Sequence, residues 1–292
     1  MFSGSMVALV TPMHKDGSVD QQALKRLIDF HVEAGTDGLV IAGTTGESAT
    51  LTKPEHAELI FKAVEIADGR IPVIAGTGSN ATAQTLDLSR AVEGSGAKAF
   101  LVVTPYYNKP TQEGLYRHFS TLADNLSVPL VLYNVPGRTG CDMLPATVAR
   151  LAPHPNIIAI KEAVGDPQRC KELVERCGDQ IDVFSGDDPT ILEFFRFGAK
   201  GVISVTANVA PRRMHKTCAA ALAGDFDTAE AINSELVELH QLLFVESNPI
   251  PVKWAVHKMG LIDEGIRLPL TWLSEAGQQV LLPALIKAGV VK

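Results

Sequence analysis

Eight short apolar runs recur along the first part of the chain, and segments with helical patterning separate them. The runs are 6–10, 38–42, 72–75, 99–103, 129–133, 157–160, 183–184 and 201–205. Most of them recur at a spacing of about 30 residues, which suits one strand, one helix and two loops in each unit. Because the runs are apolar without alternation, they are typical of parallel strands that are buried on both faces.

Eight such units fit a closed (β/α)₈ barrel better than an open doubly wound sheet. Three segments repeat weakly, each with a glycine that ends a helix just before a strand: 35–43, 96–104 and 198–206. The first run leads into 10–17, which lacks a G-x-G-x-x-G fingerprint and so argues against a Rossmann fold. We therefore predict the α/β class, with a (β/α)₈ TIM barrel as the catalytic domain over residues 1–211.

From residue 212 onward the pattern is only helical, which predicts a C-terminal helical region over 212–292. The expected helices span 226–243, 249–258 and 274–287, and we expect them to pack on the barrel or on a partner subunit.

Local signals mark the ends of several barrel helices. Thr52 and Glu55 form a capping-box pattern, and Gly35 predicts the end of the first helix. Asp188 before Pro189 predicts an N-cap with proline in the first turn.

Composition excludes several classes of protein. The chain carries 26 Lys and Arg against 33 Asp and Glu, a net charge of −7 with no basic block, which argues against a nucleic-acid partner. No apolar stretch approaches the roughly 18 residues of a membrane span, so we expect no membrane partner. The 4 cysteines lack C-x-x-C spacing, which favours reduced thiols in the cytoplasm. The 8 histidines form no H-x-x-x-H pair, so we predict no metal.

Lys161 is the most informative polar residue of the chain. It follows the wholly apolar run 157–160 at the end of the sixth predicted strand, where barrel enzymes place their chemistry. Apolar surroundings disfavour a charged ammonium, which frees the amine to attack a carbonyl. The residues indicate Schiff-base chemistry, and the alternative is a lysine that reaches the rim and pairs with Glu162.

Polar side chains end other predicted strands as well. Tyr133 ends the fifth strand, where its phenol either carries protons for Lys161 or only packs in the core. Thr44 and Thr45 lie between two glycines, in a cradle for a carboxylate or in a simple tight turn. Arg138 offers a planar fork to a second carboxylate, or is an ordinary surface arginine.

Four motifs follow one another along the chain: Gly43-Thr-Thr-Gly-Glu47, Thr104-Pro-Tyr-Tyr-Asn-Lys-Pro110, Tyr133-Asn-Val-Pro-Gly-Arg-Thr139 and Ile158-Ala-Ile-Lys-Glu162. With them the chain resembles the pyruvate-dependent class I aldolases, the family that includes N-acetylneuraminate lyase. The Tyr-Tyr pair and the Pro-Gly-Arg-Thr sequence resemble the dihydrodipicolinate synthase branch of that family. The similarity covers essentially the whole chain, including the helical tail.

The resemblance implies an activity in the diaminopimelate route to L-lysine. Lys161 would form an imine with pyruvate, and the enamine carbon would attack the aldehyde of L-aspartate 4-semialdehyde, giving 4-hydroxy-tetrahydrodipicolinate. Tyr133, Thr44 and Tyr107 match the family's proton relay, with Tyr107 supplied across a subunit interface. The positions that match substrate contacts are Thr45, Ile203, Arg138 and Gly186. The resemblance also implies a homotetramer of two dimers, and no cofactor, because the protonated imine is the electron sink.

Lysine-inhibited relatives of that branch bind L-lysine at the dimer interface. The positions matching that effector site are Ser48, Ala49, Leu51, His56, Asn80 and Tyr106. Two further positions differ, because Lys53 stands at a histidine site and Gln84 at a glutamate site. An added cation and a lost carboxylate both disfavour a cationic ligand, so we predict weak inhibition by lysine.

Three other functions compete with this hypothesis. A retro-aldol lyase acting on a sugar acid is disfavoured by Arg138 and by the pair Tyr106 and Tyr107. A metal-dependent hydrolase or isomerase needs a cluster of His, Asp and Glu at the strand ends, which the sequence does not show. A barrel that only binds carboxylates would leave no covalent adduct with pyruvate.

Overall fold

The computed structural model describes residues 2–291, and within them eight parallel strands form a closed barrel in the order β1 to β8. The strands are β1 (Gly4–Ala8), β2 (Gly38–Ile41), β3 (Val73–Gly76), β4 (Ala99–Val103), β5 (Leu130–Asn134), β6 (Ile157–Glu162), β7 (Asp182–Ser185) and β8 (Gly201–Ser204). The predicted (β/α)₈ barrel is confirmed. Only β4 has the bounds expected from the sequence. The largest differences are at β1, which begins and ends two residues earlier, and at β6, which extends through Lys161 and Glu162.

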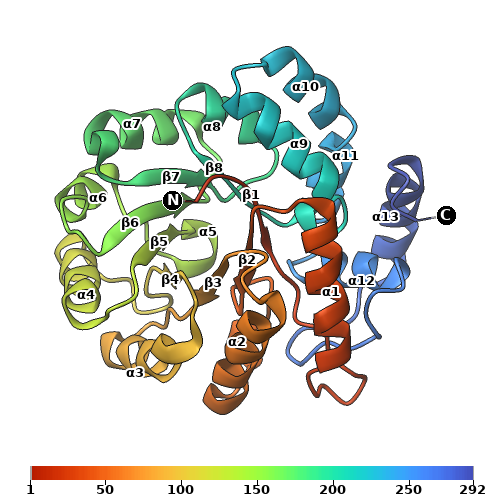
Figure 1. Cartoon of the computed structure of the whole chain (residues 1–292), viewed down its shortest axis with the longest axis horizontal. Helices are drawn as coiled ribbons and strands as arrows, with labels where there is room; N and C mark the ends of the chain where they lie inside the picture. Colours follow the sequence, from red (N-terminus) through yellow and green to blue (C-terminus); the bar gives the residue numbers. More distant parts are fainter. Residues whose placement is uncertain (1, 292) are drawn as a thin grey trace.

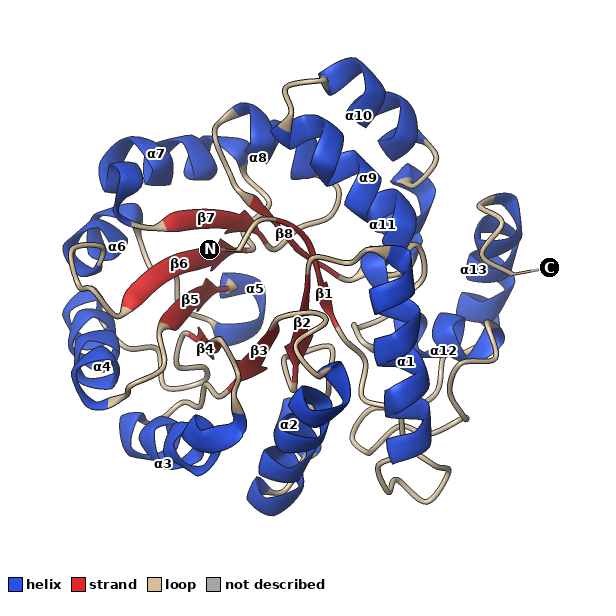
Figure 2. Cartoon of the chain, in the orientation of Figure 1, coloured by secondary structure: helices blue, strands red, loops and turns tan. Residues whose placement is uncertain are grey.

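Helices follow every strand, and most of them form the outer layer of the barrel (Figures 1 and 2). They are α1 (Gln21–Ala34), α2 (Lys53–Ala67), α3 (Thr82–Val92), α4 (Gln112–Asn125), α5 (Pro136–Thr139), α6 (Pro145–Leu151), α7 (Pro167–Cys177), α8 (Ile191–Arg196) and α9 (Pro211–Leu222). The short helix α5 lies inside the ring of outer helices in Figure 1. It begins directly after β5, so it carries Arg138 close to the strand that holds Tyr133.

Two apolar layers stabilise the barrel. One fills its interior and includes Val131 and Ala159, while the other lies between the strands and the helices and includes Leu132 and Ile160. Consecutive side chains of a strand point to opposite faces. This alternation decides which polar residues at the ends of β5 and β6 reach the interior.

The C-terminal helices follow α9. They are α10 (Phe226–Ser234), α11 (Val237–Leu242), α12 (Ile250–Lys258) and α13 (Glu275–Lys287). The single helix predicted over 226–243 is wrong, since a turn at Leu236 divides it into α10 and α11. Leu236 and Leu239 are both buried, so the helical spacing of apolar residues continues across the turn. The sequence pattern therefore gives no sign of the turn. Helix α9 packs on β1 and α1, and the division of the chain at residue 211 stays a prediction.

The predicted helix ends have mixed outcomes. The capping box of Thr52 and Glu55 is confirmed, and Gly35 ends α1 in the left-handed conformation, with φ of 83°. The N-cap at Asp188 is wrong, because α8 begins only at Ile191. Buried Asp188 instead accepts hydrogen bonds of 2.9 Å from the backbone N–H groups of residues 205 and 206, which would otherwise be buried without partners.

None of the helices within residues 2–291 is long and apolar enough to cross a membrane.

Candidate active site

Lys161 and Tyr133 lie side by side inside the barrel. They are register partners on β6 and β5, and each is only 6% exposed. The Lys161 Nζ atom lies 4.4 Å from the centre of the Tyr133 ring. Glu162 points to the opposite face of β6, where it accepts hydrogen bonds from Asn134 and from the Val164 N–H. The alternative in which Lys161 pairs with Glu162 is therefore absent from the described part of the chain.

Gly186 lies beside Lys161, and Ile203 lies in the interior of the same barrel. Gly186 follows β7, and a Cβ atom there would lie 2.8 Å from Lys161 Cε and 2.7 Å from Ala163 Cβ. A side chain at this position would push against Lys161, so only a glycine lets the backbone after β7 approach the lysine this closely. Ile203 is buried in the interior cluster on β8. The structure thus brings two of the predicted substrate contacts to the barrel interior that also holds Lys161.

The Gly43–Glu47 motif forms the turn after β2, and the C-terminal region holds it in place. Thr45 is buried, and its Oγ1 accepts a hydrogen bond of 3.0 Å from Asn248 Nδ2. Glu47 has a left-handed backbone, with φ of 57°, and its carboxylate forms a fully buried ion pair with Lys253 of α12. Burial lowers the pKa of the Lys253 ammonium, and the adjacent carboxylate opposes that effect.

Sequence reasoning missed the roles of Asn248 and Lys253 in supporting this turn. The available signal was a lysine inside the otherwise apolar segment 250–256. A lysine that is wholly surrounded by apolar residues needs a buried anionic partner. The partner lies 206 positions away along the chain, so the sequence alone did not identify it.

A cavity of about 560 Å³ opens between the turn after β2 and helix α5. Its lining includes these predicted site residues: Thr44, Ser48, Ala49, Leu51, His56, Tyr106 and Arg138. The exposed Arg138 donates a hydrogen bond of 3.1 Å from Nη2 to the carbonyl of Asn248. Asn80 is not among the lining residues, and its carbonyl accepts a hydrogen bond from Asn108. Thr44 and Arg138, predicted for the reaction, therefore line the same cavity as most of the predicted effector positions.

The two divergent effector positions also line this cavity. Lys53 Nζ lies 2.5 Å from Asp87 Oδ2, and Gln84 Oε1 accepts a hydrogen bond of 2.9 Å from Ser79. His56 Nε2 lies 2.6 Å from the Gly76 carbonyl, and burial lowers the pKa of its imidazole, so the ring is neutral near pH 7. The Asp87 carboxylate is thus already paired with a lysine of the same chain.

Tyr107 stands apart from the other predicted catalytic residues. Its side chain is 88% exposed, its φ is 75°, and its N–H donates to the Thr139 carbonyl at 3.2 Å. No hydrogen bond connects it to Thr44 or Tyr133 within the described residues. A single chain therefore does not assemble the predicted proton relay.

Residues 2–291 contain no group of three or more His, Cys, Asp or Glu side chains that could hold a metal ion.

Known proteins resemble this chain over its whole length. Residues 1–288 match the family model described as the Dihydrodipicolinate synthetase family. Two curated relatives named 4-hydroxy-tetrahydrodipicolinate synthase, from Methylococcus capsulatus and Stutzerimonas stutzeri, are 59% and 57% identical, with 100% of each chain covered. A crystal structure of dihydrodipicolinate synthase from Acinetobacter baumannii, complexed with pyruvate, matches with a TM-score of 0.98 at 52% identity and covers 100% of both chains. The chain therefore belongs to the dihydrodipicolinate synthetase family.

Proposed function

We propose that this protein condenses pyruvate with L-aspartate 4-semialdehyde to 4-hydroxy-tetrahydrodipicolinate, the product in the name of its curated relatives. The observation that carries the proposal is the Lys161 amine, which is buried inside the barrel against Tyr133, with Gly186 packed closely against the lysine side chain. Pyruvate as the first substrate is supported by the pyruvate complex of the Acinetobacter relative.

In the proposed reaction the Lys161 amine attacks the keto carbon of pyruvate, and the carbinolamine loses water to form an imine. Loss of a methyl proton gives an enamine, whose carbon bonds to the aldehyde carbon of the second substrate. The substrate amine then attacks the former keto carbon and closes the ring as the C–N bond to Lys161 breaks. Tyr133 is the proposed proton carrier, because its ring lies against the Lys161 amine.

The two substrate carboxylates have separate proposed partners. Thr45 Oγ1 accepts from Asn248, so its own O–H remains available to donate to the pyruvate carboxylate. Arg138 lines the mouth of the cavity, where its guanidinium suits the carboxylate of the semialdehyde. Thr44 lines the same cavity as Arg138, and we assign its hydroxyl to the proposed proton relay.

Borohydride trapping tests this function. The protein is incubated with pyruvate and sodium borohydride, and mass analysis locates the reduced adduct. We expect the adduct on Lys161, none with Lys161→Ala, and a normal yield with Lys98→Ala, which changes an exposed lysine at the start of β4. An adduct on another lysine would overturn the mechanism, and the absence of any adduct would favour a barrel that only binds carboxylates. Faster turnover of a sugar acid than of the semialdehyde would favour the retro-aldol alternative.

The active form is proposed to be a homotetramer of two dimers, in which Tyr107 of one subunit completes the site of another. The strong exposure of Tyr107 supports this arrangement. Mixing inactive Tyr107→Phe and Lys161→Ala subunits should restore about one quarter of the active sites, because each mixed dimer regains one intact site. Sedimentation gives the oligomer size, and a mixture that stays inactive would contradict the shared site.

The cytoplasm is the proposed location. The cysteines Cys141, Cys170, Cys177 and Cys218 are free and buried, as is typical of a protein from a reducing compartment. Fractionation of cells that express the tagged protein checks the location, and recovery from the periplasm would contradict it.

Weak inhibition by L-lysine is proposed for the effector positions of the cavity. Lys53 adds a cation there, its partner Asp87 is already engaged, and Gln84 is neutral. We expect half-inhibition only above about 1 mM lysine, and tighter inhibition by roughly tenfold in the double variant Lys53→His with Gln84→Glu. Half-inhibition of the wild type below that concentration would contradict the proposal.

A further inference from the structure

A buried polar pair lies directly behind the two residues of the imine chemistry. Asn134 and Glu162 are register partners on β5 and β6, one position after Tyr133 and Lys161, and both are 0% exposed. Because side chains alternate along a strand, this pair points toward the helix layer while the preceding pair points into the barrel. Asn134 Nδ2 lies 3.2 and 3.1 Å from the two carboxylate oxygens of Glu162.

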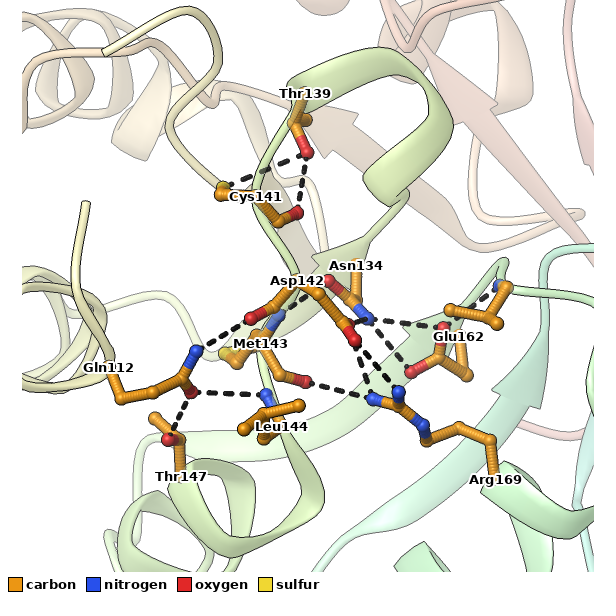
Figure 3. Close-up of polar contacts among 11 residues, drawn as sticks. Gln112, Asn134, Thr139, Cys141, Asp142, Met143, Leu144, Thr147, Glu162 and Arg169 are labelled. Carbon is orange, nitrogen blue, oxygen red and sulfur yellow. Dashed lines mark hydrogen bonds and ion pairs between the residues drawn. The ribbon is translucent and has the colours of Figure 1, made fainter. Parts of the chain in front are cut away.

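The pair extends into a network that fixes the segment after β5 (Figure 3). Asn134 Nδ2 also lies 2.8 Å from Asp142 Oδ1, and its Oδ1 accepts from the Met143 N–H at 2.9 Å. Arg169 of α7 donates to both carboxylate oxygens of Asp142, at 3.2 and 2.7 Å. The segment between Asn134 and Asp142 includes α5 and therefore Arg138.

The polar groups of this network have partners even though they are buried. Glu162 Oε1 also accepts from the Val164 N–H at 2.9 Å. Burial raises the pKa of the Glu162 carboxyl to about 7, and the nearby guanidinium of Arg169 pairs with Asp142 instead. A satisfied buried network favours one arrangement of its strands, because any other leaves polar groups without partners.

We propose that Asn134 and Glu162 are positioning residues: their contact behind the barrel wall holds β5 and β6 in the register that sets Tyr133 against Lys161. The inference rests on the proposed function. Neither side chain faces the barrel interior, so each acts through its neighbour in the strand. Slippage or local separation of the two strand ends would move the phenol relative to the amine, and a displacement of about 1 Å at a reacting group costs on the order of 10²-fold in rate.

The test compares the same substitution at two asparagines. Asn134→Ser removes the contact behind the active site. Asn156→Ser is the matched control, because Asn156 precedes β6 at its opposite end and donates to the carbonyls of residues 123, 126 and 128. The measurements are the melting temperature, the rate of formation of the borohydride-trapped Lys161 adduct at saturating pyruvate, and the KM for pyruvate.

We expect Asn134→Ser to slow adduct formation roughly 10- to 100-fold, with the KM for pyruvate changed less than about threefold. Asn156→Ser should lower the melting temperature but leave the adduct rate within about twofold of the wild type. Equal adduct rates in the two variants would overturn the proposal. If Asn134→Ser does not fold, the nearly isosteric Glu162→Met decides, because its side chain cannot accept from the Asn134 amide. A wild-type adduct rate in that variant would also overturn the proposal. If the wild type itself forms no adduct, the proposed function fails instead.

Discussion

Two buried glutamates, at the carboxyl ends of β2 and β6, are stabilised in different ways. Glu47 forms a fully buried ion pair with Lys253 of α12. Glu162 accepts hydrogen bonds from the Asn134 amide and the Val164 N–H instead. The Glu47 carboxylate has a paired charge, whereas burial raises the pKa of the Glu162 carboxyl to about 7.

The difference shows which part of the chain supports each side of the active site. Glu47 and its partner are 206 positions apart, so the ion pair ties the C-terminal region to the turn that carries Thr44 and Thr45. Glu162 and Asn134 are 28 positions apart on the neighbouring strands β6 and β5. The side of the site that holds Lys161 and Tyr133 is therefore supported by the barrel without the C-terminal region. The helical tail is therefore part of the site on the β2 side.

The largest expected effect comes from breaking the ion pair. Lys253→Met leaves the Glu47 carboxylate buried without a cation, which should lower the free energy of unfolding by about 3–5 kcal/mol. Urea unfolding followed by circular dichroism measures the loss. Adding Glu47→Gln to this variant should recover part of it, because the buried charge is then gone.

Lys258→Met is the control for that substitution. Lys258 is an exposed residue on the same helix, so its replacement should change the free energy of unfolding by no more than about 0.5 kcal/mol. Similar losses at the two lysines would show that the Glu47 pair has no special role.

A smaller effect is expected in the pH dependence of stability at Glu162. Burial raises the pKa of its carboxyl from the usual 4.5 to about 7 in the folded state, and the charges of Arg169 and Asp142 act on it in opposite directions. Below pH 4.5 the carboxyl is protonated in both states. Between pH 4.5 and 7 the unfolded chain loses the proton first, so stability falls as pH rises, by about 3 kcal/mol in total.

Glu162→Gln removes this titration and should flatten the decline of the free energy of unfolding between pH 5 and 8. The control Glu175→Gln changes an exposed glutamate of α7 and should keep the wild-type decline. An unchanged pH slope in Glu162→Gln would mean that the buried carboxyl is already ionised well below neutral pH.

The sequence predicted much of the barrel and the placement of Tyr133 and Lys161 at the ends of β5 and β6, because the signals there are local. The apolar run 157–160 predicts a strand, and Lys161 follows that run directly. This places Lys161 at the end of a strand without any information on the rest of the chain. The Glu47 contact with Lys253 could not be predicted in this way, because it depends on how the tail returns to the barrel. The local sequence around Asp188 matches a helix cap, but its carboxylate accepts hydrogen bonds from buried backbone N–H groups after β8 instead.

The smallest expected effect tests whether the tail acts on the site through a single hydrogen bond. Asn248→Ala removes the donor that holds the Thr45 hydroxyl, while the backbone carbonyl that accepts from Arg138 remains. The free energy of unfolding should fall by about 1 kcal/mol, and the KM for pyruvate should rise about fivefold as Thr45 becomes free to turn away. The adduct rate at saturating pyruvate should stay near the wild-type value, since Lys161 and Tyr133 are held by β5 and β6 and not by the tail.

Asn125→Ala is the control, because it changes an exposed amide on α4. It should leave the free energy of unfolding and the KM for pyruvate unchanged. A wild-type KM for pyruvate in Asn248→Ala would mean that this contact of the tail contributes only to stability and not to pyruvate binding.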